Sequence, residues 1–173
     1  MSNDNLQTPK YIIDALGSFD LDPCAGSFTS IGIKNITDIR GECGLSEKWE
    51  GCVYVNPPFS QKEKWIQKMI DHGNGILLLP ERGSAPWFGP LAKSCGCYFV
   101  MGKKINFIGG SSSNNVGSVL FPFGSEAIEK IKNSGLPGHF VNVVWYNARI
   151  AQRQILPMVG FQGTTAHHQH KVK

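Results

Sequence analysis

Two consecutive prolines constrain this chain more than any other feature of its sequence. They follow the apolar run Cys-Val-Tyr-Val at positions 52–55 and belong to the tetrapeptide Asn56-Pro57-Pro58-Phe59. Each proline ring fixes φ at about −65° and removes a backbone N–H donor, and the residue before a proline is driven into an extended conformation. The sequence therefore predicts a strand that ends stiffly at Asn56, because pairing cannot continue without donors.

The groups left at this strand end suit a planar base that carries an amino group. The Asn56 side-chain oxygen and the Pro57 carbonyl can each accept one N–H, and Phe59 can stack on the ring. The same residues also fit a plain loop, in which the prolines block further pairing and Phe59 anchors the core. The tetrapeptide alone leaves both interpretations open.

The length of 173 residues suits one domain, which we expect at 1–163, followed by a disordered tail at 164–173. The net charge of +4 favours a polyanionic partner. No apolar run approaches the roughly 18 residues that span a bilayer, and the polar N-terminus does not resemble a signal peptide. We therefore expect a cytoplasmic protein with no membrane association and no obligate protein partner.

The five cysteines form no pattern that would bind a metal. Their number is odd, no CxxC pair occurs, and Cys95-Gly96-Cys97 lacks the spacing of zinc ligands. We predict reduced thiols that act as small core residues, and no metal site.

Apolar periodicity and turn residues predict alternating strands and helices. Thr8 is predicted to cap a helix over 9–16 whose first residue is Pro9. Further helices are expected after residue 60, over 86–93 and over 124–134, and strands over 19–21, 31–36, 53–55, 75–79, 97–101, 116–123 and 140–146. This order, with its strand-rich end, predicts a three-layer α/β domain.

A second motif follows the first predicted strand, with the sequence Asp22-Pro23-Cys24-Ala25-Gly26. In an open α/β sheet, ligands bind at the carboxyl ends of the strands. An acid there can hold an ammonium or hydroxyl groups of a ligand, and a glycine lets the backbone come close to it. A polar turn with proline and glycine would give the same pattern, so this motif is also ambiguous by itself.

Together, the motifs resemble those of amino-group DNA methyltransferases, and most of all the phage-type Dam-like DNA N6-adenine methyltransferases. The resemblance runs from Thr8 to about Phe123. Its matching segments are Thr8-Pro9, 19–25, Gly44-Leu45 with Trp49, 56–59, 77–80 with Trp87-Phe88, 105–107 and 117–120. The family implies a three-layer Rossmann-like methyltransferase sheet, mostly parallel with an antiparallel strand near the C-terminus.

The resemblance implies S-adenosylmethionine as cofactor. Thr8 and Pro9 would approach its methionine carboxylate and Asp22 its ammonium, while the wall would come from Pro23, Cys24, Ala25 and Gly26. The family's acidic residue before Gly-Leu is replaced by Cys43, so Asp38 and Glu42 are the candidates for the ribose contact. Pro23-Cys24 looks like the nucleophile of cytosine-C5 methyltransferases, but it follows the cofactor strand, so we predict a buried residue with no nucleophilic role.

The implied reaction is methyl transfer to N6 of an adenine flipped out of DNA, with Asn56, Pro57, Pro58 and Phe59 as catalytic residues. Two acceptors would hold the amine and Phe59 would stack on the base. The alternatives are a catalytically silent nucleic-acid-binding protein on the same fold, or a methyltransferase that acts on RNA adenine or protein glutamine.

No separate DNA-recognition domain fits within this length. Five basic residues are candidates for phosphate contacts, and the glycine-rich loop 109–115 is a candidate for a groove contact. Each of the five also fits a solvated surface charge. They are Arg82, Lys103, Lys104, Arg149 and Arg153.

Overall fold

The computed structural model describes residues 6–26, 31–37, 43–102, 104–110 and 116–142. These form four α-helices, α1 (Lys10–Leu16), α2 (Lys62–His72), α3 (Phe88–Cys95) and α4 (Gly124–Asn133), and one 3₁₀ helix, η3 (Phe59–Gln61). The strands are β1 (Phe19–Asp22), β2 (Gly32–Asn35), β3 (Val53–Val55), β4 (Gly75–Pro80), β5 (Cys97–Val100), β6 (Ser118–Phe123) and β7 (Gly138–Val141). The predicted α/β class is confirmed.

The seven strands form one mixed sheet in the order β2-β1-β3-β4-β6-β5-β7. β2, β1, β3 and β4 pair in parallel, whereas β6 is antiparallel to β4 and β5, and β7 is antiparallel to β5. Parallel pairing is thus confined to the first part of the sheet, and the expectation of a mostly parallel sheet is only partly right. The reason is that no helix lies among the described residues between β5 and β6, and a parallel strand needs such a crossover.

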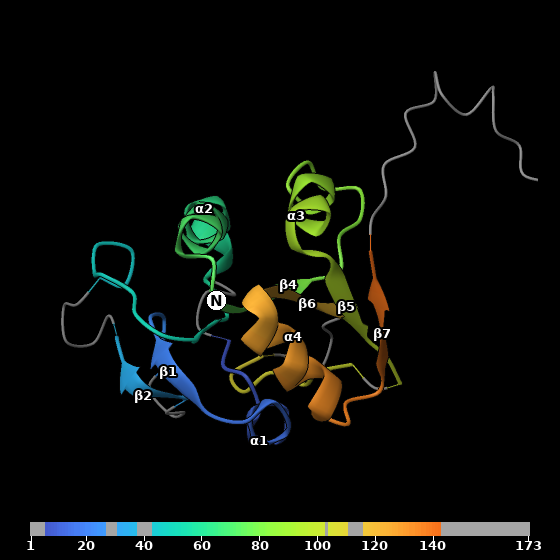
Figure 1. The fold of residues 1–173 in the computed structure, drawn as a ribbon, viewed down its shortest axis with the longest axis horizontal. Helices are drawn as coiled ribbons and strands as arrows, with labels where there is room; N and C mark the ends of the chain where they lie inside the picture. The colour runs from blue at the N-terminus through green and yellow to red at the C-terminus, as the bar shows by residue number, and fades with distance from the viewer. Residues whose placement is uncertain (1–5, 27–30, 38–42, 103, 111–115, 143–173) are drawn as a thin grey trace, which may run out of the picture.

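Helices cover both faces of the sheet (Figure 1), with α2 and α3 on one face and α1 and α4 on the other. β4 is buried on both faces, as its continuous apolar run predicts. Leu77 and Leu79 pack into the core beneath α2 and α3, while Ile76 and Leu78 pack into the core beneath α1 and α4. The sheet is therefore a rigid middle layer that fixes where the strand ends lie.

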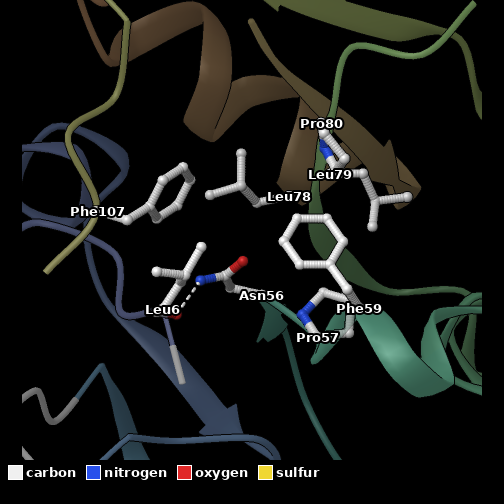
Figure 2. Close-up of a pocket in the computed structure, with 8 residues that line it drawn as sticks. All are labelled: Leu6, Asn56, Pro57, Phe59, Leu78, Leu79, Pro80 and Phe107. Atoms are coloured by element: carbon white, nitrogen blue, oxygen red, sulfur yellow. Dashed lines mark hydrogen bonds between the residues drawn. The ribbon is translucent and has the colours of Figure 1, made fainter. Parts of the chain in front are cut away.

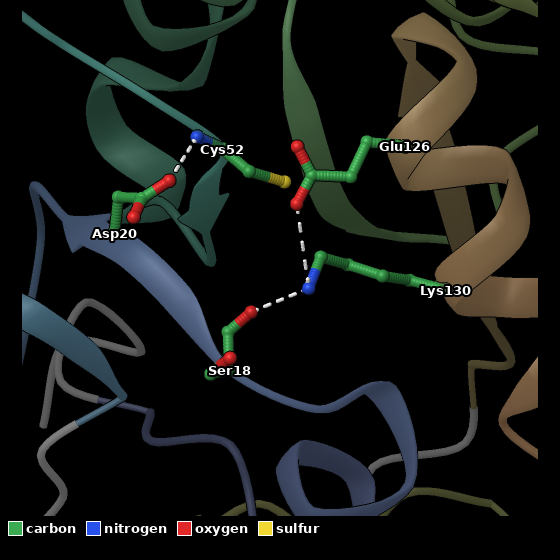
Figure 3. Close-up of polar contacts among 5 residues, drawn as sticks. All are labelled: Ser18, Asp20, Cys52, Glu126 and Lys130. Atoms are coloured by element: carbon green, nitrogen blue, oxygen red, sulfur yellow. Dashed lines mark hydrogen bonds and ion pairs between the residues drawn. The ribbon is translucent and has the colours of Figure 1, made fainter.

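Polar contacts hold α4 at the edge of the sheet where β1 and β3 begin (Figure 3). Lys130 Nζ donates to the Ser18 carbonyl at 2.6 Å and pairs with Glu126 at 3.6 Å. The Cys52 backbone N–H donates to Asp20 at 2.7 Å. Ser18 and Cys52 lie just before β1 and β3, and Asp20 near the start of β1, so the opposite edge, where the parallel strands end, is left for the two sequence motifs.

The start of α1 differs from the prediction. The helix begins at Lys10, and Pro9 is its N-cap residue, with φ −67° and ψ 147°. The buried Thr8 hydroxyl hydrogen-bonds the Tyr54 hydroxyl at 2.9 Å and makes no cap. A buried hydroxyl must find a partner, and for Thr8 that partner lies in the core. The predicted end of the helix at Leu16 is confirmed; Gly17 follows it with φ 81°, and its N–H donates to the Ile13 carbonyl.

Most other boundaries agree with the sequence within two residues. The exception is the last strand, which spans Gly138–Val141 where 140–146 was expected. Positions 143–146 lie outside the described residues, as does the whole segment 164–173. No helix within the described ranges is long and apolar enough to cross a membrane. Nor do three or more His, Cys, Asp or Glu side chains gather there as a metal site would require.

Candidate active site

The two sequence motifs meet at one edge of the sheet. β1 ends at Asp22 and β3 at Val55, and these parallel neighbours are in register at Leu21 and Val53. The Cys24 thiol donates to the Asn56 backbone carbonyl, with Sγ and O 3.3 Å apart. The two strand ends therefore lie close together, and a side-chain contact joins the turn after β1 to the turn after β3.

A small pocket, open to solvent, lies beside the Asn56 side chain (Figure 2). Phe59 and Phe107 lie on opposite sides of the Asn56 amide, and Leu78 closes the space between them. The lining residues are Leu6, Asn56, Pro57, Phe59, Leu78, Leu79, Pro80 and Phe107. An apolar space with one amide in its wall suits a flat ring that carries a polar substituent.

Three of the four predicted catalytic residues line this pocket. Pro58 does not; it precedes η3, and its carbonyl accepts the Gln61 N–H at 3.3 Å. The second proline therefore starts the tight helical turn that carries Phe59. The Pro58 carbonyl is thus used within this turn, and of the two proline carbonyls the one of Pro57 remains as the acceptor for a ligand.

The Asn56 amide has a defined orientation. Its Nδ2 donates to the Leu6 carbonyl at 2.8 Å, and the amide oxygen faces the other way, toward Leu78 in Figure 2. Within the described residues Oδ1 accepts no hydrogen bond. Asn56 is half-buried, so this oxygen stays accessible from the pocket and can accept an N–H from a ligand there.

Asp22 is a buried carboxyl group, only 2% exposed, at the end of β1. Burial raises its pKa from 3.8 to about 7, and hydrogen bonds from Cys24, including the backbone N–H at 3.1 Å, offset part of this rise. No cation in the described part of the chain pairs with Asp22. A cationic group of a ligand would stabilise its ionised form, since an opposite charge favours ionisation.

The other predicted cofactor residues differ in burial. Pro9, Pro23 and Ala25 are buried, and Cys24 and Gly26 are half-buried, so Cys24 is less enclosed than predicted. A Cβ at Gly26 would lie 2.3 Å from the Gln7 side chain, and one at Gly44 only 1.8 Å from the Pro23 carbonyl oxygen. The turn after β1 is thus packed tightly from two sides. Asp38 and Glu42 lie outside the described residues.

Two of the five predicted phosphate contacts can be located. Arg82, just after the pocket residue Pro80, and Lys104, shortly before Phe107, are exposed. Lys103, Arg149, Arg153 and positions 111–115 lie outside the described residues. Both located residues thus lie close in sequence to the pocket lining.

Some site residues were not anticipated. Phe107 belongs to a segment of the family resemblance, but no role was predicted for it. Leu6, Gln7 and Tyr54 reach the site through contacts with residues far away in the sequence, so no local pattern marks them. Leu6 and Asn56, for example, are 50 positions apart.

One comparison with known proteins gives a match. The model of a protein family described as DNA N-6-adenine-methyltransferase (Dam) matches residues 1–129. This range contains both motifs and every residue that lines the pocket. No curated protein and no solved structure matches the chain.

Proposed function

The chain belongs to the DNA N-6-adenine-methyltransferase (Dam) family, and from this premise we propose that it transfers a methyl group from S-adenosylmethionine to N6 of an adenine flipped out of DNA. The observation that carries the proposal is the Asn56 amide, whose Oδ1 faces an apolar pocket beside Pro57 and Phe59. The order of the first strands supports a Rossmann-like methyltransferase sheet, in which ligands bind where parallel strands end.

The residues around Asp22 fit the cofactor. A buried carboxyl with a pKa of about 7 and no cation beside it in the described residues suits the ammonium of the methionine moiety. Thr8, Pro9, Pro23, Cys24, Ala25 and Gly26 would form the wall around the methionine moiety, and Asp38 or Glu42 would contact the ribose. When bound, S-adenosylmethionine supplies a sulfonium-activated, electrophilic methyl group.

Asn56 and Pro57 act on the amine of the base. The lone pair of adenine N6 is delocalised into the ring, so the amine is a poor nucleophile. Oδ1 of Asn56 and the carbonyl of Pro57 accept its two N–H groups and favour a more tetrahedral nitrogen with an available lone pair. Because both acceptors are fixed by the fold, they stabilise the positive charge that develops on nitrogen without reorganising.

Phe59 holds the flipped base. A base inside a duplex cannot reach a pocket of this kind, so it must leave the stack. Stacking on an aromatic ring recovers about 1–3 kcal/mol of that cost. Phe59 lines the pocket beside the Asn56 amide, where its ring can take a stacked base.

Transfer of labelled methyl groups to DNA, RNA and protein tests the proposal against its alternatives. We expect label in DNA alone, and loss of at least about a hundredfold in rate for Asn56→Ala with near-normal cofactor affinity, because the amide acts in the chemical step. Label in RNA or in protein glutamine would favour the corresponding alternative. DNA binding without transfer, in a folded protein that binds the cofactor, would favour a silent binding protein.

A further inference from the structure

The segment Leu6–Thr8, here called the N-terminal strap, contacts both halves of the site. The Leu6 carbonyl accepts the Asn56 Nδ2–H at 2.8 Å, and the Thr8 hydroxyl bonds the Tyr54 hydroxyl at 2.9 Å. Between them, Gln7 exchanges two backbone hydrogen bonds with Ile108, at 3.0 and 2.9 Å. Three successive residues are therefore fixed to two parts of the molecule, the end of β3 and the segment around Ile108.

The strap has little room to shift. Gln7 is 7% and Thr8 1% exposed, so both are enclosed. A Cβ at Gly26 would lie 2.3 to 2.4 Å from three atoms of the Gln7 side chain, so the strap lies directly against the turn after β1. Close packing of this kind transmits any displacement of one segment to the next.

The Leu6 carbonyl distinguishes the two ends of the Asn56 amide. Rotating the amide by half a turn exchanges Oδ1 and Nδ2, which have nearly the same shape but opposite hydrogen-bonding roles. A carbonyl oxygen can accept from Nδ2–H, whereas Oδ1 in the same place would put two acceptors against each other. The strap thus favours the orientation in which Oδ1 faces the pocket (Figure 2).

We propose that the N-terminal strap is the positioning element of the active site, and that the Leu6 carbonyl holds the Asn56 amide with its oxygen toward the target amine. The inference rests on the proposed function and deepens it, since it names what orients the acceptor. Leu6, Gln7 and Thr8 are positioning residues: they act through Asn56 and the turn after β1.

The Asn56→Asp variant tests the Leu6 contact directly. The introduced carboxyl keeps the acceptor and the shape of the amide, but it can donate to the Leu6 carbonyl only when protonated. Single-turnover rates at saturating cofactor should therefore rise relative to wild type by about tenfold or more as the pH falls from about 8.5 to about 6.5. Because the nearby Asp22, with a pKa of about 7, titrates in the same range, while burial raises the pKa of Tyr54 above it, the ratio of variant to wild type is the quantity to compare. A ratio that stays flat with pH, in a folded variant, would overturn the inference.

The Gly26 and Gln7 pair gives a second test that does not alter Asn56. Gly26→Ala should displace the strap and lower the single-turnover rate by about tenfold at saturating cofactor, because the new Cβ collides with Gln7. In a Gln7→Gly background, where that collision is absent, the same substitution should cost less than about threefold. Gly83→Ala is the matched control, since a Cβ there meets nothing within 4 Å.

Equal losses from Gly26→Ala in both backgrounds would mean that Gln7 does not transmit the displacement, and would contradict a rigid strap. If Asn56→Asp does not fold, the comparison of Gly26→Ala in the wild-type and Gln7→Gly backgrounds tests the strap instead. Wild-type protein that transfers no methyl group to DNA refutes the proposed function itself. Wild-type protein that methylates DNA, combined with a flat ratio or with equal losses, refutes the strap alone.

Discussion

Asp22 combines deep burial with a place at the end of the first strand. Burial raises the pKa of Asp22 to about 7, so ionisation of this carboxyl costs free energy. The hydrogen bonds from Cys24 offset only part of that cost. Perturbed carboxyl groups in such positions are typical of functional sites. The cost in the free protein is what a cationic ligand would relieve.

The burial of Asp22 predicts a pH-dependent stability. Between about pH 4 and pH 7 the folded state holds a proton that the unfolded state has lost, so the free energy of unfolding should fall as the pH rises through this range. Between about pH 4 and pH 7, the free energy of unfolding of the wild type should fall on the order of 4 kcal/mol more than that of Asp22→Asn. Denaturant melts of both proteins from pH 4 to pH 8 measure this difference. Asp14→Asn, on the exposed side of α1, is the control, and the same loss in both variants would show that Asp22 is not its source.

Phe59 is expected to act through its ring. Phe59→Ala should weaken binding to DNA with an abasic site opposite the target adenine by about 1–3 kcal/mol, while Phe59→Tyr keeps most of the affinity, since stacking needs an aromatic face. Fluorescence anisotropy with such duplexes measures the DNA affinity of each variant. Equal losses for Ala and Tyr, in folded proteins, would identify Phe59 as a packing residue.

At the scale of elements, each strand end is placed by ordinary sequence signals. The β1 and β3 motifs are local, so their positions followed from an apolar run and the residues after it. Local patterns do not predict the antiparallel pairing of β6 or the position of the N-terminal strap. Both depend on contacts between distant segments, such as Leu6 with Asn56. Thr8 shows the same limit: its local pattern predicts a helix cap, but a buried tyrosine 46 positions away takes its hydroxyl.

Gly44, in the loop before β3, packs against Pro23, so a larger residue at position 44 should displace the turn after β1. A Cβ at Gly44 would lie 1.8 Å from the Pro23 carbonyl oxygen, which is backbone and cannot turn aside as a side chain can. Gly44→Ala should therefore weaken S-adenosylmethionine binding by about tenfold or more, as calorimetry would show. Gly83→Ala is again the control. Unchanged affinity in a folded Gly44→Ala protein would mean that the turn after β1 does not contact the cofactor.

At the scale of the whole molecule, net charge and the exposed cations near the pocket set the expectation for DNA. The charge of +4 is modest, so binding should depend on a few well-placed contacts rather than on a general field. Arg82 and Lys104 are the described candidates, and both belong to segments that also contribute to the pocket lining. DNA held there would bring a flipped base toward Asn56.

Lys104→Ala should lower DNA affinity and reduce the slope of log affinity against log salt by about 1, since each phosphate contact releases about one counterion. Cofactor affinity should stay the same. Lys48→Ala is the control, because Lys48 pairs with Glu50 just before β3 begins, at the other edge of the sheet. A wild-type slope in the Lys104→Ala protein would direct attention to Arg82.

The chemical identity of the product tests the central claim most directly. DNA is incubated with S-adenosylmethionine that carries a deuterated methyl group, digested to nucleosides and analysed by mass spectrometry. We predict deuterated N6-methyldeoxyadenosine from the wild type, and none from Asn56→Ala that still binds the cofactor. A label on cytosine, no label in DNA despite a folded and cofactor-bound protein, or equal labelling by the two proteins would contradict the account.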